Sequence, residues 1–239
     1  MQMTLWKAAC TGNAANCIYP NKAVVDDEKA MEAAVAQDHV CATYTGNRRS
    51  NDNFIESDVI PMDIDNDHSD DPADWITEEK MEELFDSIDY VLAPSRHHML
   101  AKDGNSERPR YHAYFPIEKC TDAAQYAAMK VAIQNVYPFF DDNALDAARF
   151  LFGATVDEIV WHEGWMSIMD DIEIEESDDG DFDDGVVSSP ILEGSRNKTL
   201  SRFAGKVLKR YGECDKAHEV FLEQAAKCDP PLEDAELST

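Results

Sequence analysis

The chain has 239 residues, of which 44% are hydrophobic, so it is long enough for one main domain with an apolar core and a smaller appended one. Its formal net charge of −28 argues against simple polyanion binding, because lysine and arginine contacts dominate affinity for phosphate backbones. With no apolar run of 18 residues, no leader-like opening and six scattered cysteines, we expect a cytoplasmic protein with reduced thiols and no membrane partner.

The first sixty residues predict one helix followed by one strand. Hydrophobic residues recur at helical spacing over residues 26–37, and residues 39–44 have the composition of a strand. Residues 45–53 are polar and contain Gly and Asn, as a loop does. The two arginines of this loop, Arg48 and Arg49, are weak candidates for contact with phosphate or a nucleic-acid template.

The apolar run over residues 59–65 carries two aspartates, Asp63 and Asp65. On a β-strand alternate side chains share a face, so these two carboxylates project together while Met62 and the isoleucines point the other way. Carboxylates roughly 6.5–7 Å apart along a strand can share a pair of divalent cations. A surface strand can also carry such a pair by chance, so the later motifs decide between the two interpretations.

The rest of the main domain predicts further helices and short strands. Thr77 is placed as the N-cap of a helix, and residues 90–93 read as a short strand that ends near Ser95. Thr121 is expected to cap an Ala-rich helix that runs to about residue 136. Shorter strand-like runs follow over residues 150–153 and 158–161.

Residues 110–117 alternate as a strand, with Arg110 and His112 on one face and aromatic or apolar residues mainly on the other. A lone histidine in a strand is usually a satisfied structural residue. Beside two metal-binding carboxylates, however, His112 and Arg110 are suited to contact a triphosphate. We therefore treat both as candidate nucleotide-binding residues.

A second acidic group precedes a short strand later in the chain. Asp142 is a candidate third metal ligand and Arg149 a candidate phosphate contact, with Asp141 and Asp146 as competing ligands. The alternative is that these aspartates only cap and solvate a turn.

Taken together, the elements predict an α+β catalytic domain over residues 1–169, with helices on one face of a mixed or antiparallel sheet and the other face open. An acidic linker over residues 170–189 and a small helical domain over residues 190–239 follow. This last domain carries a stripe of basic residues, which is unusual in so acidic a chain. The backbone of a template or primer strand is a reasonable partner for the stripe. The stripe includes Arg196, Lys198, Arg202 and Lys206.

In chain order, residues 62–65, then Ser95 ahead of residues 111–116, then Asp142 ahead of Arg149, resemble the three motifs of the archaeo-eukaryotic primase superfamily. The resemblance is closest to phage and plasmid primase-polymerases. Residues 194–200 and 230–237 look like the helical domain that follows such primase domains, and the chain stops inside that motif.

The resemblance implies an RRM-like sheet and a DNA primase or primase-polymerase that uses Mg²⁺ or Mn²⁺. Asp63, Asp65 and Asp142 would hold two metal ions, while His112 would bind the phosphates of an incoming nucleotide; a role for Ser95 is implied less directly. The implied partners are single-stranded DNA, NTP or dNTP, and a helicase that is fused downstream or separate. The implied setting is a phage or plasmid in a bacterial host.

Two alternatives stay open at this point. A non-enzymatic acidic protein that mimics DNA is favoured by the net charge alone. A metal-dependent nuclease would use the same carboxylates to cleave a strand without added nucleotide.

Overall fold

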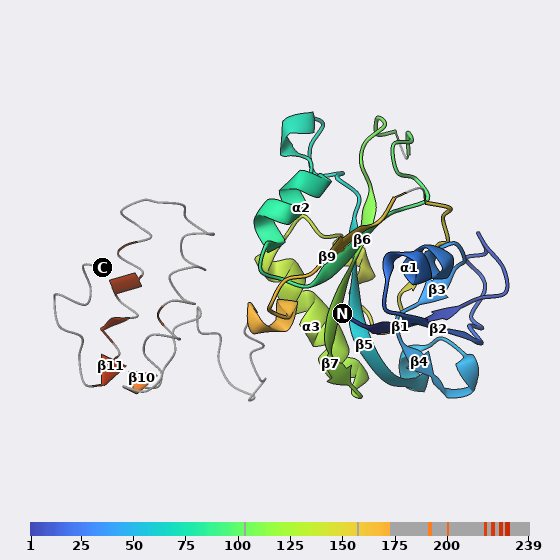
Figure 1. Cartoon of the computed structure of the whole chain (residues 1–239), viewed down its shortest axis with the longest axis horizontal. Helices are drawn as coiled ribbons and strands as arrows, with labels where there is room; N and C mark the ends of the chain where they lie inside the picture. The colour runs from blue at the N-terminus through green and yellow to red at the C-terminus, as the bar shows by residue number, and fades with distance from the viewer. Residues whose placement is uncertain are drawn as a thin grey trace. The chain divides into compact units, whose positions relative to one another are not determined.

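The chain divides into two compact units, Met1–Glu175 and Glu176–Thr239, in a computed structural model. The structure describes residues 1–102, 104–156, 158–172, 191–192, 200, 218, 221–222, 225–226 and 228–229. The first unit contains two antiparallel sheets and three α-helices among these residues (Figure 1).

The larger sheet has five strands in the order β4-β5-β7-β6-β9, and every neighbouring pair is antiparallel. The strands are β4 (Thr43–Tyr44), β5 (Phe54–Ile64), β6 (Tyr90–Pro94), β7 (Tyr111–Cys120) and β9 (Val160–His162). In the central pair Asp63 of β5 lies directly opposite His112 of β7. This register brings the two principal sequence motifs together on adjacent strands.

The smaller sheet has the order β2-β1-β3-β8 and is also antiparallel. Its strands are β1 (Met3–Lys7), β2 (Asn21–Val25), β3 (His39–Val40) and β8 (Phe150–Leu151), and helix α1 (Glu28–Val35) follows β2. The side chain of Asp27 caps α1 by accepting a hydrogen bond from the Ala30 nitrogen. The predicted strand over residues 39–44 is divided between the two sheets, as β3 and β4.

Helices α2 (Glu78–Phe85) and α3 (Ala123–Val136) pack against the apolar face of β5 and β7. Figure 1 draws them on the side of the larger sheet away from β1, β2 and α1. Thr77 caps α2 as predicted. The cap of α3 is Asp122 and not Thr121, because the Asp122 carboxylate accepts from the Gln125 nitrogen.

The opposite face of the larger sheet is covered, and the expectation that it would be open is wrong. Val59, Val91 and Tyr114 of this face share a hydrophobic cluster with Met3 and Leu5 of β1. Burying this apolar layer removes hydrocarbon from water on both sides of the sheet. The polar site described below lies at the end of β5, past this layer.

Short 3₁₀ helices connect several of these elements: η1 (Thr45–Asn47), η2 (Asn51–Asn53), η3 (Pro72–Asp74), η4 (Asp142–Ala144) and η5 (Ile168–Asp170). Residues just after η5 belong to the first unit and not to the expected linker. The Asp171 carboxylate accepts from the Tyr137 hydroxyl at 2.7 Å, and Ile172 is buried in the core under α2 and α3.

In the second unit, β10 (Ile191–Leu192) pairs in parallel with β11 (Cys228–Asp229). Leu200 and Ala225 are buried in a small cluster with Cys228. The expected basic residues and most of the acidic linker lie outside the described residues; the basic residues are Arg196, Lys198, Arg202 and Lys206.

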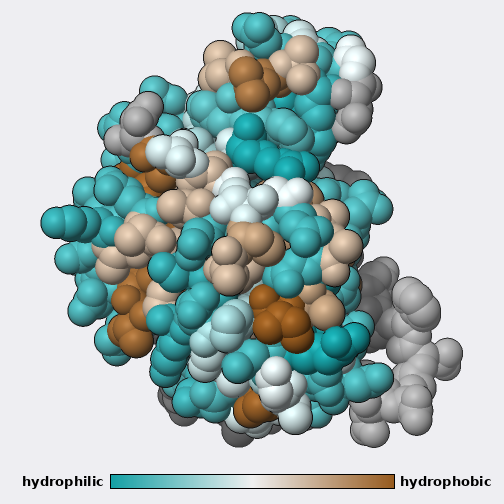
Figure 2. All heavy atoms as spheres, turned by 90° about the vertical axis from the view of Figure 1, so that its right-hand side faces the viewer, coloured by the Kyte–Doolittle hydropathy of each residue, from teal (hydrophilic) through white to brown (hydrophobic). Residues whose placement is uncertain are grey.

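None of the helices in the described part of the chain is long and apolar enough to cross a membrane. The face in Figure 2 is mainly hydrophilic, with its hydrophobic residues in small separate groups. Scattered groups of this size are ordinary for a protein surface and identify no docking site.

Candidate functional site

The centre of the candidate site is the pair formed by Asp63 and His112. The side chains are only 7% and 13% exposed, and the His112 Nε2 atom lies 3.8 Å from the Asp63 Oδ1 atom. Burial lowers the pKa of His112, while the neighbouring Asp63 carboxylate acts in the opposite direction. The net shift is downward, so His112 is neutral at neutral pH and presents one N–H donor and one acceptor nitrogen.

Arg149 reaches the same carboxylate from the segment before β8. Its Nη2 atom contacts the Asp63 Oδ2 atom. Its buried Nε–H has no hydrogen-bond partner among the described residues. A buried donor without a partner beside a partly neutralised carboxylate is suited to an anionic oxygen of a ligand.

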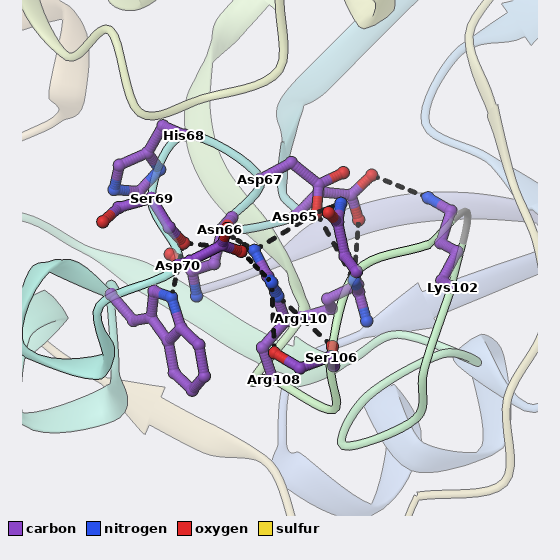
Figure 3. Close-up of polar contacts among 12 residues, drawn as sticks. Asp65, Asn66, Asp67, His68, Ser69, Asp70, Lys102, Ser106, Arg108 and Arg110 are labelled. Carbon is purple, nitrogen blue, oxygen red and sulfur yellow. Dashed lines mark hydrogen bonds and ion pairs between the residues drawn. The ribbon is translucent and has the colours of Figure 1, made fainter.

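Asp65 follows the last residue of β5 and is held by cations from the connection between β6 and β7. The Lys102 Nζ atom lies 2.9 Å from the Asp65 Oδ2 atom, with the two side chains 27% and 28% exposed. The Arg110 Nε atom lies 3.8 Å from Oδ1 of the same carboxylate. Figure 3 shows Lys102 and Arg110 approaching Asp65 from this connection. Sequence reasoning missed Lys102, because no motif or spacing distinguishes it from any other lysine in a turn.

Arg110 is fully buried and is committed to the surrounding loops. Its Nη1 atom donates to the carbonyl oxygens of Leu100, at 2.7 Å, and His97, at 3.3 Å, while Nη2 lies 3.4 Å from Asp67. In this arrangement it stabilises the loops beside Asp65. Its assignment as a nucleotide-binding residue stays a prediction.

The acidic loop after Asp65 is shaped by a second buried arginine, Arg108 (Figure 3). Its Nη1 atom donates to the carbonyl oxygens of Asn66, at 2.8 Å, and Ser69, at 3.1 Å, and its Nη2 atom to the Asp70 carboxylate, at 2.9 Å. Asn66 adopts a left-handed backbone conformation, with φ of 55°. Sequence reasoning missed Arg108, because its partners come from a segment about forty residues earlier.

The segment around Asp142 lies beside Asp63, since the Asp141 nitrogen donates to the Asp63 carbonyl oxygen at 2.9 Å. The Asp141 carboxylate accepts from the Asn143 nitrogen, and that of Asp146 from the Ala148 nitrogen. The carboxylates of Asp141 and Asp146 therefore cap their own turns. Asp142 is the first residue of η4 and is exposed.

Among the described residues, no group of three or more His, Cys, Asp or Glu side chains is arranged to hold a metal ion. The assignment of Asp142 as a third ligand therefore stays a prediction.

The remaining predicted residues lie away from the Asp63–His112 pair or have structural partners. The Ser95 nitrogen donates to the Arg110 carbonyl oxygen at 2.9 Å, at the end of β6. Ser95 lines a cavity of about 490 Å³ together with Arg96, His98 and the segment after β8. Arg49 donates from Nη1 to the Ala148 carbonyl oxygen at 2.8 Å, and Arg48 is exposed.

The donor set at Asp63 and Asp65 suits a hard divalent cation that is shared with a substrate. Carboxylate oxygens are the protein ligands that Mg²⁺ and Mn²⁺ prefer. Mg²⁺ is commonly bound by one or two carboxylates together with substrate phosphates, and not by an all-protein cage. Two carboxylates flanked by Lys102, Arg149 and His112 fit that kind of shared site.

No protein-family model matches the sequence, and no curated protein is significantly similar to it. Among solved structures, the chain is similar to the AEP domain of the primase-polymerase of cyanophage S-2L. The two are 13% identical, with a TM-score of 0.38, and the match covers 68% of this chain and 82% of that chain. At this TM-score the likeness does not establish a family, so we argue function from the side chains of the site.

Proposed function

We propose that the chain is a nucleotidyltransferase of the primase-polymerase kind, which joins nucleotides into a primer on single-stranded DNA. One observation carries the proposal. Two adjacent antiparallel strands and their flanking turns place His112 and Arg149 against Asp63, and Lys102 against Asp65 two residues further along the chain. Carboxylates with neighbouring nitrogen donors are the groups that bind a divalent cation and a triphosphate, and this supports the proposal.

In the proposed mechanism, Asp63 and Asp65 hold Mg²⁺ or Mn²⁺, with Asp142 as the candidate further ligand. The bound metal would supply charge neutralisation for the triphosphate and activation of the attacking 3′-hydroxyl. The chain's own nitrogen donors bind and orient the phosphates. Arg149 offers its unpartnered Nε–H, and neutral His112 adds a hydrogen bond without a further charge.

In the proposal, Lys102 and Arg149 form ion pairs with the carboxylates before the substrate binds and with the phosphates afterwards. In the structure each cation is paired with one aspartate. A divalent cation competes with them for the carboxylate oxygens, and the triphosphate offers them new anionic partners. We therefore expect metal and nucleotide to bind cooperatively, each making room for the other.

The net charge of −28 is compatible with this function if template affinity comes from elsewhere. Nucleic-acid affinity depends on local lysine and arginine contacts and not on total charge alone. The basic residues of the second unit, with the weaker candidate Arg48, would contact template or primer. A helicase, fused or separate, would keep the enzyme on its template.

A primer-synthesis assay on single-stranded DNA, with Mn²⁺ and either NTPs or dNTPs, tests the proposal. We expect Asp63→Asn to abolish incorporation, because it removes a charged ligand with little change in shape. Asp26→Asn is the matched control, since Asp26 is exposed between β2 and α1 and is remote in sequence from the site. Equal activity of the two variants would refute the site.

The same preparation separates the alternatives. A nuclease would cleave the strand with metal and no nucleotide, whereas a DNA mimic would neither extend a primer nor bind Mn²⁺ together with dNTP. Calorimetric titration of Mn²⁺ with and without dNTP measures whether the two bind together.

A further inference from the structure

The turn just before Arg149 is held by three side chains from other parts of the fold. Three consecutive carbonyl oxygens each accept one of these hydrogen bonds. The bonds run from Lys130 Nζ to Asp146, at 3.2 Å, from the Tyr44 hydroxyl to Ala147, at 2.7 Å, and from Arg49 Nη1 to Ala148, at 2.8 Å. The donors lie on α3, on β4 and just after η1.

Carbonyl groups in a short connecting turn are normally satisfied by water, because such turns lie on the surface. Here one donor, Lys130, is fully buried, and burial lowers its pKa to about 8. Tyr44 is also buried. Placing a lysine and a tyrosine hydroxyl in the interior is unfavourable unless each has a polar partner, and the partners here include these carbonyls.

Fixing consecutive carbonyls fixes the peptide planes between them, and with them the direction in which the next side chain leaves the backbone. The next residue is Arg149, whose guanidinium contacts Asp63. Immediately afterwards, Phe150 pairs with Val40 in the smaller sheet. Arg149 therefore leaves from a segment that is fixed on both sides.

We propose that Tyr44, Arg49 and Lys130 are positioning residues that hold this turn so that Arg149 meets both Asp63 and the phosphates of the nucleotide. The inference rests on the proposed function of the site and adds a set of residues that touch neither metal nor substrate. It also replaces the expected role of Arg49 in template contact. An arginine side chain has many rotamers. Fixing its backbone reduces the conformational entropy that is lost when Arg149 binds the nucleotide.

Tyr44→Phe is the sharpest test, because it removes one hydroxyl and keeps the ring. Tyr126→Phe is the matched control, since the Tyr126 hydroxyl also donates to a buried carbonyl, that of Val59, at 2.7 Å, but outside the turn. We expect Tyr44→Phe to raise the KM for nucleotide about 3- to 10-fold with kcat little changed, and Tyr126→Phe to leave KM unchanged.

A double-mutant cycle with Arg149→Gln shows whether Tyr44 acts through Arg149. On the Arg149→Gln background, Tyr44→Phe should change KM by less than about 2-fold, because the side chain that it positions is no longer an arginine. Full additivity in this cycle, or equal KM values for Tyr44→Phe and Tyr126→Phe, would overturn the inference.

A second readout keeps this inference separate from the proposed function. In urea unfolding, the effects of Tyr44→Phe and Arg149→Gln should be non-additive, whereas those of Tyr126→Phe and Arg149→Gln should add. If the wild-type chain makes no primer but this coupling is present, the proposed function fails and the positioning of Arg149 stands. If primer synthesis is present but the coupling is absent, the positioning role is refuted and the function stands.

Discussion

Replacing Lys102 with glutamine should change the affinities for metal and nucleotide in opposite directions. The Lys102 Nζ atom lies 2.9 Å from the Asp65 carboxylate, which is a proposed metal ligand. Removing the charge frees that carboxylate for Mn²⁺ and at the same time removes one donor to the triphosphate. A lysine with a purely structural role would not change the metal and nucleotide affinities in opposite directions.

The expected gain in Mn²⁺ affinity follows from the exposure of the Lys102 and Asp65 side chains. Both side chains are more than a quarter exposed, so their net interaction is that of a surface ion pair, about 0.2–1 kcal/mol. Releasing it should strengthen binding of Mn²⁺ alone by about 1.4- to 5-fold. A hydrogen bond from a charged donor to a phosphate contributes more, about 1.5 kcal/mol, so nucleotide affinity at saturating Mn²⁺ should fall about tenfold.

Calorimetric titration gives both affinities, first for Mn²⁺ alone and then for a non-hydrolysable dNTP analogue at saturating Mn²⁺. Lys80→Gln is a suitable control, because Lys80 forms an exposed pair with Glu83 at 2.8 Å on α2. The control should leave both affinities unchanged. Weaker binding of Mn²⁺ to Lys102→Gln, or no change in nucleotide affinity, would refute the proposed exchange of partners.

Three further predictions concern the scaffold, and urea unfolding measures all of them. Burial lowers the pKa of His39 from 6.5 to about 4, so the unfolded chain binds more protons in this window and stability falls as the pH falls through it. Between pH 7 and about pH 5 the free energy of unfolding should fall by about 2 kcal/mol because of His39, and His39→Gln should not show this fall. Equal pH dependence of unfolding in the two proteins would contradict the prediction. Arg108→Met should lower the free energy of unfolding by about 2–4 kcal/mol, because the carbonyls of Asn66 and Ser69 lose their donor; a change below about 1 kcal/mol would show that water replaces it. Asn66→Ala should lower the free energy of unfolding by about 2–3 kcal/mol, because alanine is strained in the left-handed conformation and the side-chain bonds to Ile76 and Pro109 are lost. Asn66→Gly should lower it by less, because glycine adopts that conformation freely.

Short-range patterns were sufficient to predict the part of the fold that holds Asp63 and His112. The alternation over residues 59–65 and 110–117 separates an apolar face from a polar one, and the structure places the two aligned segments on paired strands. Thr77 likewise begins its helix as its type and position predict. These predictions succeed because side-chain direction in a strand and a cap at a helix start depend on neighbours in sequence.

The features that sequence reasoning missed depend on partners that are distant in the chain. Strand β1 was not predicted, and strand β2 is largely exposed and lacks a clear alternation. Arg110 was predicted to contact a triphosphate, and its burial was missed because it depends on loop carbonyl and carboxylate partners that the sequence does not reveal. Lys102 enters the site through the fold of a turn, for which the chain carries no distinctive pattern.

The arginine bonds in the loop beside Asp65 have a consequence for how the protein responds to acid. Arginine keeps its proton at any pH at which proteins fold, and peptide carbonyl oxygens do not titrate in that range. The shortest bonds of Arg108 and Arg110 include those to such oxygens, of Asn66 and Leu100. These arginine–carbonyl bonds therefore do not depend on pH within that range. The loop beside Asp65 should therefore keep its shape when the pH changes, and any activity lost on such a change could return without a refolding step.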